Sequence, residues 1–199
     1  MIGFAATLKT MTVKDTQDLW NELQELSKNR VLVGVPSATS ERKEGEGIGN
    51  AALAYIHDKG SPKQGIPARP FMQPGIAKAQ NRVNNELFAA AQASLAGDQE
   101  GLFLRLNRAG MFAMNSIRKV INIGDGFAPL KRSTLLARTR KRAYSWWGID
   151  KETAKGLTHE QRMALRKQQR ETIMSSMHPL IDTGQLRNAI TYVIEDGEK

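Results

Sequence analysis

The sequence predicts an α+β fold in which a small antiparallel sheet packs with two long helices. Two short segments, 30–35 (RVLVGV) and 189–195 (AITYVIE), are rich in β-branched residues, which is typical of strands. We expect the first, which Pro36 ends, to be a buried strand, and we expect the two to pair. Two longer segments, about 75–95 and about 98–123, carry apolar residues at helical spacing, and each is followed by a glycine that ends it. A basic helical region downstream completes the predicted fold.

Each long helix has a predicted buried stripe. For the first helix the stripe consists of Ile76, Ala79, Val83, Leu87, Ala91 and Leu95. For the second helix it consists of Leu102, Leu106, Ala109, Ala113, Ile117 and Val120, with Phe103 and Phe112 widening it. These two stripes should supply most of the core.

The N-terminal part alternates between predicted structure and loop. Residues 12–29 predict an amphipathic helix with an apolar stripe of Leu19, Trp20, Leu23 and Leu26. Residues 36–49 are rich in serine, glycine and charge, which is typical of a loop. Residues 50–60 predict a short helix, with Asn50 as its cap and Gly60 after its end.

A proline-rich connector follows at 66–76, IPARPFMQPGI. Each proline removes an amide donor and favours extended backbone before it, so we expect an extended segment with Pro74 just before the next helix. Within it, Phe71 either fills the core, with Arg69 in solvent, or both residues belong to an assembly surface.

The positive charge is concentrated in one region. Residues 131–170 contain 12 Lys/Arg and three acids, a net charge of +9, whereas the other residues hold 17 of each sign. Such a block is either a solvated face or a contact with DNA phosphates or an acidic protein. Residues of its first part are the candidates for that contact: Lys131, Arg132, Arg138, Arg140, Lys141 and Arg142.

Further along the block, Trp146 and Trp147 could stack on single-stranded nucleic acid, but paired tryptophans favour a subunit interface. After them, residues 157–177 predict an exposed helix that begins with a capping box of Thr158 and Gln161. A helical turn capped around Asp182 or Thr183 should then lead into the last strand.

No catalytic or metal-binding motif is present in the sequence. There is no cysteine, and the three histidines, His57, His159 and His178, are scattered. The glycines at 45, 47 and 49 follow the strand at 30–35 too late for a dinucleotide loop. We therefore expect no enzyme activity and no cofactor, and the lack of a leader or long apolar run predicts a soluble, unprocessed protein.

Three segments in order carry a resemblance to known proteins. They are AALAYIHDKG (51–60) followed by the connector, then FAPLKRSTLLARTRKR (127–142), and last HPLIDTGQLRNAITYVI (178–194). Together they resemble the tail-component and virion-morphogenesis families of siphophages and Mu-like phages, the tail-completion and neck proteins of tailed bacteriophages. The order of the three motifs is more specific than any one of them.

This resemblance implies a structural subunit that forms a ring, commonly six-fold, in the phage neck or at the head-proximal end of the tail. The implied partners are further copies of the chain, adjacent neck, connector and tail-tube proteins, and DNA in the central channel. The implied location is the virion, after synthesis in the bacterial cytoplasm. The residues that match are expected to determine fold and assembly: Arg69, Pro70, Phe71, Asp182, Thr183, Gly184, Leu186 and Arg187.

The chain departs from these families at 144–178, which we interpret as a helical insertion in a single α+β domain spanning residues 1–199. The role of that insertion cannot be carried over from the family. Two other functions stay open. The chain is a basic DNA-binding protein acting through the 131–170 block, or it is an assembly factor absent from the finished particle.

Overall fold

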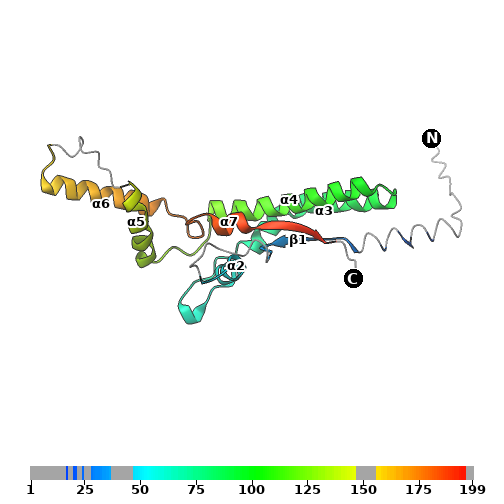
Figure 1. Ribbon diagram of the computed structural model, residues 1–199, viewed down its shortest axis with the longest axis horizontal. Coiled ribbons are helices and arrows are strands. Elements are labelled where there is room, and N and C mark those ends of the chain that lie inside the picture. Colours follow the sequence, from blue (N-terminus) through cyan, green and yellow to red (C-terminus); the bar gives the residue numbers. More distant parts are fainter. Residues whose placement is uncertain are drawn as a thin grey trace, which may run out of the picture. The chain divides into compact units, whose positions relative to one another are not determined.

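A computed structural model gives the fold of this protein (Figure 1). It describes residues 17, 20, 21, 24, 28–36, 47–146 and 156–195, and of 140–146 it describes only the backbone. Over these residues the fold is α+β, as predicted. Its elements, in order, are β1(Arg30–Gly34), α2(Asn50–Lys59), a 3-10 turn η2(Pro62–Gln64), α3(Met72–Leu95), α4(Gln99–Ile123), α5(Arg132–Trp146), α6(His159–Ser175), α7(Gln185–Ala189) and β2(Thr191–Glu195).

The chain divides into two compact units. Unit 1 combines Met1–Gly34, Ile76–Ser116 and Thr191–Lys199, and unit 2 combines Val35–Gly75 and Ile117–Ile190. The single domain with an insertion at 144–178 stays a prediction. Of the predicted helix 12–29, the five described residues between 17 and 28 are helical; the rest of it, and loop residues 37–46, lie outside the described part.

The sheet of unit 1 consists of β1 and β2, paired antiparallel with Val31 opposite Ile194 and Leu32 opposite Val193, which confirms the predicted pairing. Val31 and Ile194 pack against Ala90, Leu102 and Leu106 of the long helices. Because side chains alternate along a strand, Leu32 and Val193 lie on the opposite face. Both are exposed, so the prediction that 30–35 is a buried strand is wrong for that face.

The ring of Tyr192 lies against Gly110 of α4, where the Cβ of any other residue would collide with it. Tyr192 also donates a hydrogen bond from its hydroxyl to Asn107 Oδ1 at 3.2 Å. A glycine inside a helix normally costs stability. At position 110 it allows the last strand to approach the helix closely.

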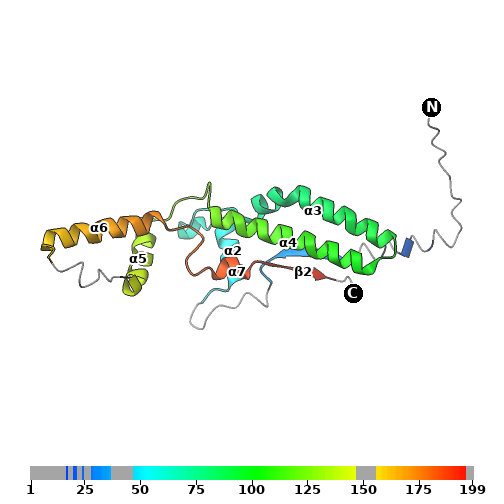
Figure 2. The same ribbon diagram turned by 90° about the horizontal axis from the view of Figure 1, so that it is seen from above.

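Helices α3 and α4 lie side by side and antiparallel (Figures 1 and 2), joined by a turn in which Gly97 has a φ of 71°. All six residues of the predicted α4 stripe are buried, although Phe103 is exposed. The predicted α3 stripe is wrong in part, because Ile76, Leu87 and Leu95 are exposed. The side that α3 buries consists mainly of small residues together with one acid: Gly75, Ala79, Glu86, Ala90 and Ser94.

The acid, Glu86, forms ion pairs with two arginines of α4: its Oε2 lies 3.1 Å from Arg105 Nη1, and its Oε1 lies 3.2 Å from Arg108 Nη2. A buried carboxylate is tolerable only when it is paired, and these two guanidiniums pair it. They also fix α3 and α4 in register within unit 1.

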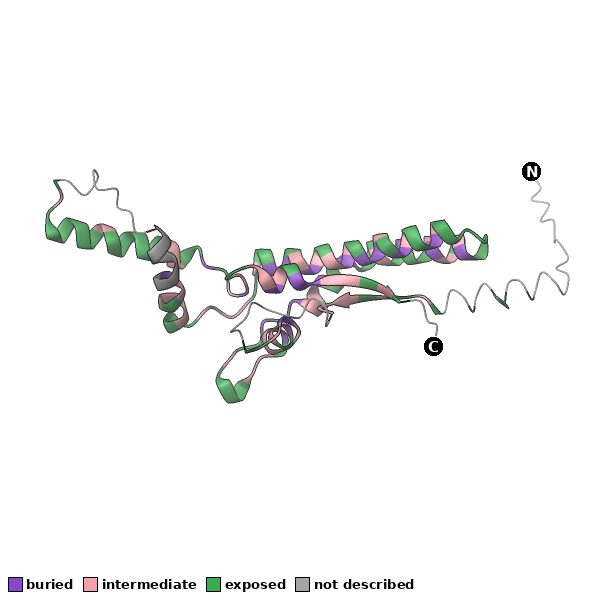
Figure 3. Cartoon of the chain, viewed as in Figure 1, coloured by how far each residue is buried: buried purple, intermediate pink, exposed green. Residues whose placement is uncertain are grey.

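Unit 2 contains α2, the connector and α5 to α7, of which α2 contacts α7 and α5 contacts α6. Asn50, the predicted cap of α2, is instead the first residue of that helix. Gly60 follows the end of α2 with a φ of 79°, as expected. Helix α3 begins at Met72, which places Pro74 inside its first turn, where proline is tolerated. Helix α6 has the predicted Thr158–Gln161 capping box and no buried residue (Figure 3).

Candidate functional site

The three segments that carry the family resemblance are tied together in unit 2, and Arg69 makes the first tie. Its guanidinium donates from Nε to the carbonyl of Ala128 at 2.8 Å and from Nη2 to the carbonyl of Pro129 at 3.1 Å. Arg69 is only 4% exposed. The alternative that Arg69 lies in solvent is therefore wrong: it joins the proline-rich connector to the FAPL segment.

Arg138 makes the second tie, from α5 to the last segment. Its Nη1 donates to the carbonyls of His178 at 3.0 Å and Ile181 at 3.2 Å, and its Nε lies 3.8 Å from Asp182 Oδ1. These contacts join α5 to the last segment, and the contact of Arg138 with DNA or an acidic partner stays a prediction.

Phe71 and Asp58 anchor the connector to α2. Phe71 is fully buried, which confirms that it fills the core. Asp58 Oδ1 accepts hydrogen bonds from the backbone amides of Phe71 at 2.9 Å and Met72 at 3.0 Å, where α3 begins. Burial raises the pKa of Asp58, but the amides of Met72 and Phe71 and the side chain of Lys59 outweigh it, so the pKa lies below its ordinary value.

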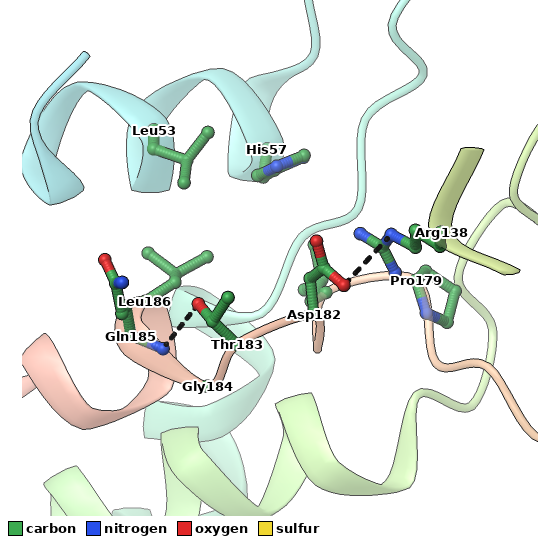
Figure 4. Close-up of a pocket in the computed structure, with 10 residues that line it drawn as sticks. Leu53, His57, Arg138, Pro179, Asp182, Thr183, Gly184, Gln185 and Leu186 are labelled. Atoms are coloured by element: carbon green, nitrogen blue, oxygen red, sulfur yellow. Dashed lines mark hydrogen bonds and ion pairs between the residues drawn. The ribbon is translucent and has the colours of Figure 1, made fainter. Parts of the chain in front are cut away.

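A cavity of about 190 Å³ lies between α2 and the last segment (Figure 4). Leu53 and His57 line it from α2, Arg138 lines it from α5, and residues 179, 180 and 182–186 line it from the last segment. Nδ1 of His57 is buried, and no described residue gives it a hydrogen-bond partner. Burial, then the charges of Arg69 and Arg138, lower the pKa of His57, so the imidazole is held neutral between two guanidiniums.

Acidification should therefore destabilise unit 2. In the unfolded chain His57 takes up a proton at its ordinary pKa, whereas in the folded protein it does so only at a lower pH. Between those two values the unfolded state binds more protons, so stability present above the ordinary pKa is lost as the pH falls. We expect urea unfolding, followed by circular dichroism, to have a lower midpoint at about pH 5.5 than at about pH 7.5.

His57→Gln should lose most of that difference between the two pH values, and His159→Gln, at an exposed position on α6, should keep it. An unchanged pH dependence in His57→Gln would contradict the assignment to His57.

The other residues carried over from the resemblance have structural contacts in unit 2. Gly184 has a φ of 78° and occupies the N-cap position of α7, so neither Asp182 nor Thr183, the two predicted caps, occupies that position. Thr183 Oγ1 accepts from the amide of Gln185 at 3.4 Å, and Leu186 is buried. Arg187 donates to Asn122 Oδ1 at 3.2 Å. Pro70 is exposed.

No protein-family model, curated protein or solved structure matches this chain. The assignment of a function therefore depends on the residues of the chain itself. Among the residues that the structure describes, no three His, Asp or Glu side chains are grouped to hold a metal ion. Over the same part of the chain, no helix has the length and hydrophobicity needed to cross a bilayer.

The candidate contact residues of the basic block are only partly described. Lys131 and Arg132 are exposed, and the side chains of Arg140, Lys141 and Arg142 lie outside the described part. Trp146 is the last residue of α5, and its side chain, like the whole of Trp147, also lies outside it. The interface and DNA assignments of these residues stay predictions.

Two residues that tie the site together have no signal in the sequence that we recognised. Asp58 is a single acid next to His57 in the sequence, and its partners Phe71 and Met72 are 13 and 14 residues away. Arg118 of α4 donates to the carbonyls of Ile190 at 2.7 Å and Asn188 at 3.3 Å, at the end of α7. An arginine that donates to carbonyls far away in the sequence cannot be recognised from local sequence.

Proposed function

We propose that this protein is a structural virion protein of a tailed bacteriophage, forming an oligomeric ring in the neck or at the head-proximal end of the tail. Its partners would be further copies of itself, in a ring that the family resemblance suggests is six-fold, and the adjacent neck, connector and tail-tube proteins. Its task would be tail completion and head–tail joining, without enzymatic chemistry. It would be made in the bacterial cytoplasm and end in the virion.

One observation supports this proposal most. The three segments that resemble the phage families are separate in sequence, yet Arg69 joins the first to the second and Arg138 joins the second to the third. Contacts of this kind are expected of segments that together determine a fold. The matched Arg69, Phe71 and Leu186 are also buried, as expected of residues that determine a fold.

A second function, DNA binding, has its own supporting observation. Helix α6 buries none of its residues, and it exposes Arg166, Lys167 and Arg170 in the final part of the basic block. Exposed bases on one helix attract phosphates with an affinity that falls steeply with salt. A ring around the exit channel could use the same bases toward DNA or toward an acidic neighbouring ring.

Mass photometry of the purified chain, with and without a short DNA duplex at low and moderate salt, separates these functions. The ring proposal expects one closed oligomer whose mass does not change with DNA. A monomer or dimer that binds DNA with a steep salt dependence, and loses binding when Arg140, Lys141 and Arg142 are reversed to glutamate, would instead favour the DNA-binding function. Detection of the chain in purified virions would exclude an assembly factor that leaves the particle.

A further inference from the structure

The helix layer of unit 1 leaves an apolar surface on α3 uncovered. Leu87, Phe88 and Leu95 are exposed, Phe88 by 67%, and Ala91 lies between them at helical spacing; we call these four residues the α3 patch. After Arg82, Glu86 is the last charged residue of α3, and it is turned inward to Arg105 and Arg108. The exposed surface of α3 from residue 83 to residue 95 is therefore uncharged.

The sheet layer of unit 1 leaves a second apolar surface uncovered. Leu32 is 48% exposed and Val193 is 42% exposed, and they lie opposite each other in the register; we call them the sheet patch. Their neighbours Val31 and Ile194 face the long helices, so the sheet patch faces away from them. A sheet with apolar residues on both faces needs a covering layer on each.

The two patches lie on different layers of the same unit. The buried Ala90 faces the sheet side of α3. At 3.6 residues per turn, Phe88 and Leu95 lie about 160° and 140° around the helix from Ala90, and Ala91 and Leu87 about 100° and 60°, so the α3 patch runs from the flank of the helix to its far side. Two patches that lie on different sides of a unit cannot both meet their counterparts in one two-fold symmetric contact. A contact of one patch with the other joins copies head-to-tail, and it closes into a ring when the rotation between copies allows it.

The charges of the two patches decide between kinds of partner. The α3 patch carries no charge, and the outward face of the sheet has one base and one acid, Arg30 opposite Glu195, which balance. Neither surface has the excess of basic residues that DNA binding requires. Because neither has a net charge, the two surfaces can contact each other without electrostatic repulsion. Each also supplies the layer that the other lacks: a helix for the sheet and a sheet for the helix.

We propose that the α3 patch of one copy covers the sheet patch of the next copy, and that this head-to-tail contact joins the subunits. The occupant of each surface is thus a second copy of this chain. This inference rests on the proposed ring, and it names the surfaces through which the ring would form. Depletion of charge around exposed aromatic and aliphatic residues is what the centre of a protein interface requires.

The test uses two single variants of the full chain, Phe88→Glu and Leu32→Glu, separately and mixed. Each variant alone should weaken self-association about 30-fold or more, as expected for a residue at the centre of an interface. Mixed in equal amounts, they should form a 1:1 pair and nothing larger, because each retains one intact patch. Tyr55→Glu, at a position 68% exposed in unit 2, is the control and should assemble as the wild type does.

Sedimentation velocity and mass photometry measure these outcomes, and circular dichroism checks that each variant is folded. If a glutamate prevents folding, the milder Phe88→Gln and Leu32→Thr replace it. Assembly of both variants like the wild type would overturn the inference and leave the ring proposal standing. Weakened variants that do not pair when mixed, or a monomeric wild type, would also overturn it. Open chains or pairs of wild type that depend on both patches would support the inference and overturn the closed ring.

Discussion

Phe71→Ala should lower the free energy of unfolding by about 3–5 kcal/mol, the usual cost of removing a buried phenylalanine ring. Phe71 is fully buried at the start of α3, and it is the residue at which the connector enters the core. Urea denaturation followed by circular dichroism measures the loss. Tyr55→Ala is the matched control, since that aromatic ring is 68% exposed in the same unit and should cost little. Equal losses in both variants would contradict the assignment of Phe71 to the core.

Arg69→Leu should lower the free energy of unfolding by about 2–4 kcal/mol. The leucine would still fill part of the space, but the hydrogen bonds to the carbonyls of Ala128 and Pro129 would be lost, and a hydrogen bond made by a charged group contributes about 1.5–3 kcal/mol. The free energy of unfolding of Arg69→Lys should lie between those of the wild type and Arg69→Leu, because an ammonium lacks the planar fork that reaches both carbonyls. Arg132→Leu, at an exposed position, is the control. If Arg69→Leu lost no more free energy of unfolding than Arg132→Leu, Arg69 would not stabilise the contact between the connector and the FAPL segment.

The pattern of apolar residues predicted α4 well and α3 badly, and the difference has a physical cause. The buried side of α4 carries large residues such as Leu102 and Ile117, so its hydrophobic stripe and its packing face coincide. The buried side of α3 carries Gly75, Ala79 and Ala90, because a helix packs closely where its side chains are small. At Gly75 an added Cβ would lie 2.6 Å from Ile117 Cα. The larger apolar residues of α3 therefore fall outside its packing face.

The sequence predicted which residues belong to the candidate site, but it did not predict which atoms they contact. The resemblance singled out Arg69, Phe71 and Leu186, and all three are buried in unit 2. Their partners could not be predicted, since Arg69 binds carbonyls 59 and 60 residues away and Arg138 binds carbonyls 40 and 43 residues away. Backbone carbonyls are present at every position, so no residue type marks which ones an arginine will meet.

Arg69 and Arg118 donate to neutral backbone carbonyls, and no carboxylate partner was found for either in the described hydrogen bonds. The charges of these two arginines, which are part of the chain's net charge of +9, are therefore not cancelled by the carbonyls to which they donate. The missing negative charge has to come from the surroundings, as dissolved anions, an acidic protein or a nucleic acid. An anion that binds the folded form more strongly than the unfolded chain stabilises the folded form by mass action. The free energy of unfolding of this protein should therefore be higher when anionic partners are bound, and a subunit purified without them should be less stable.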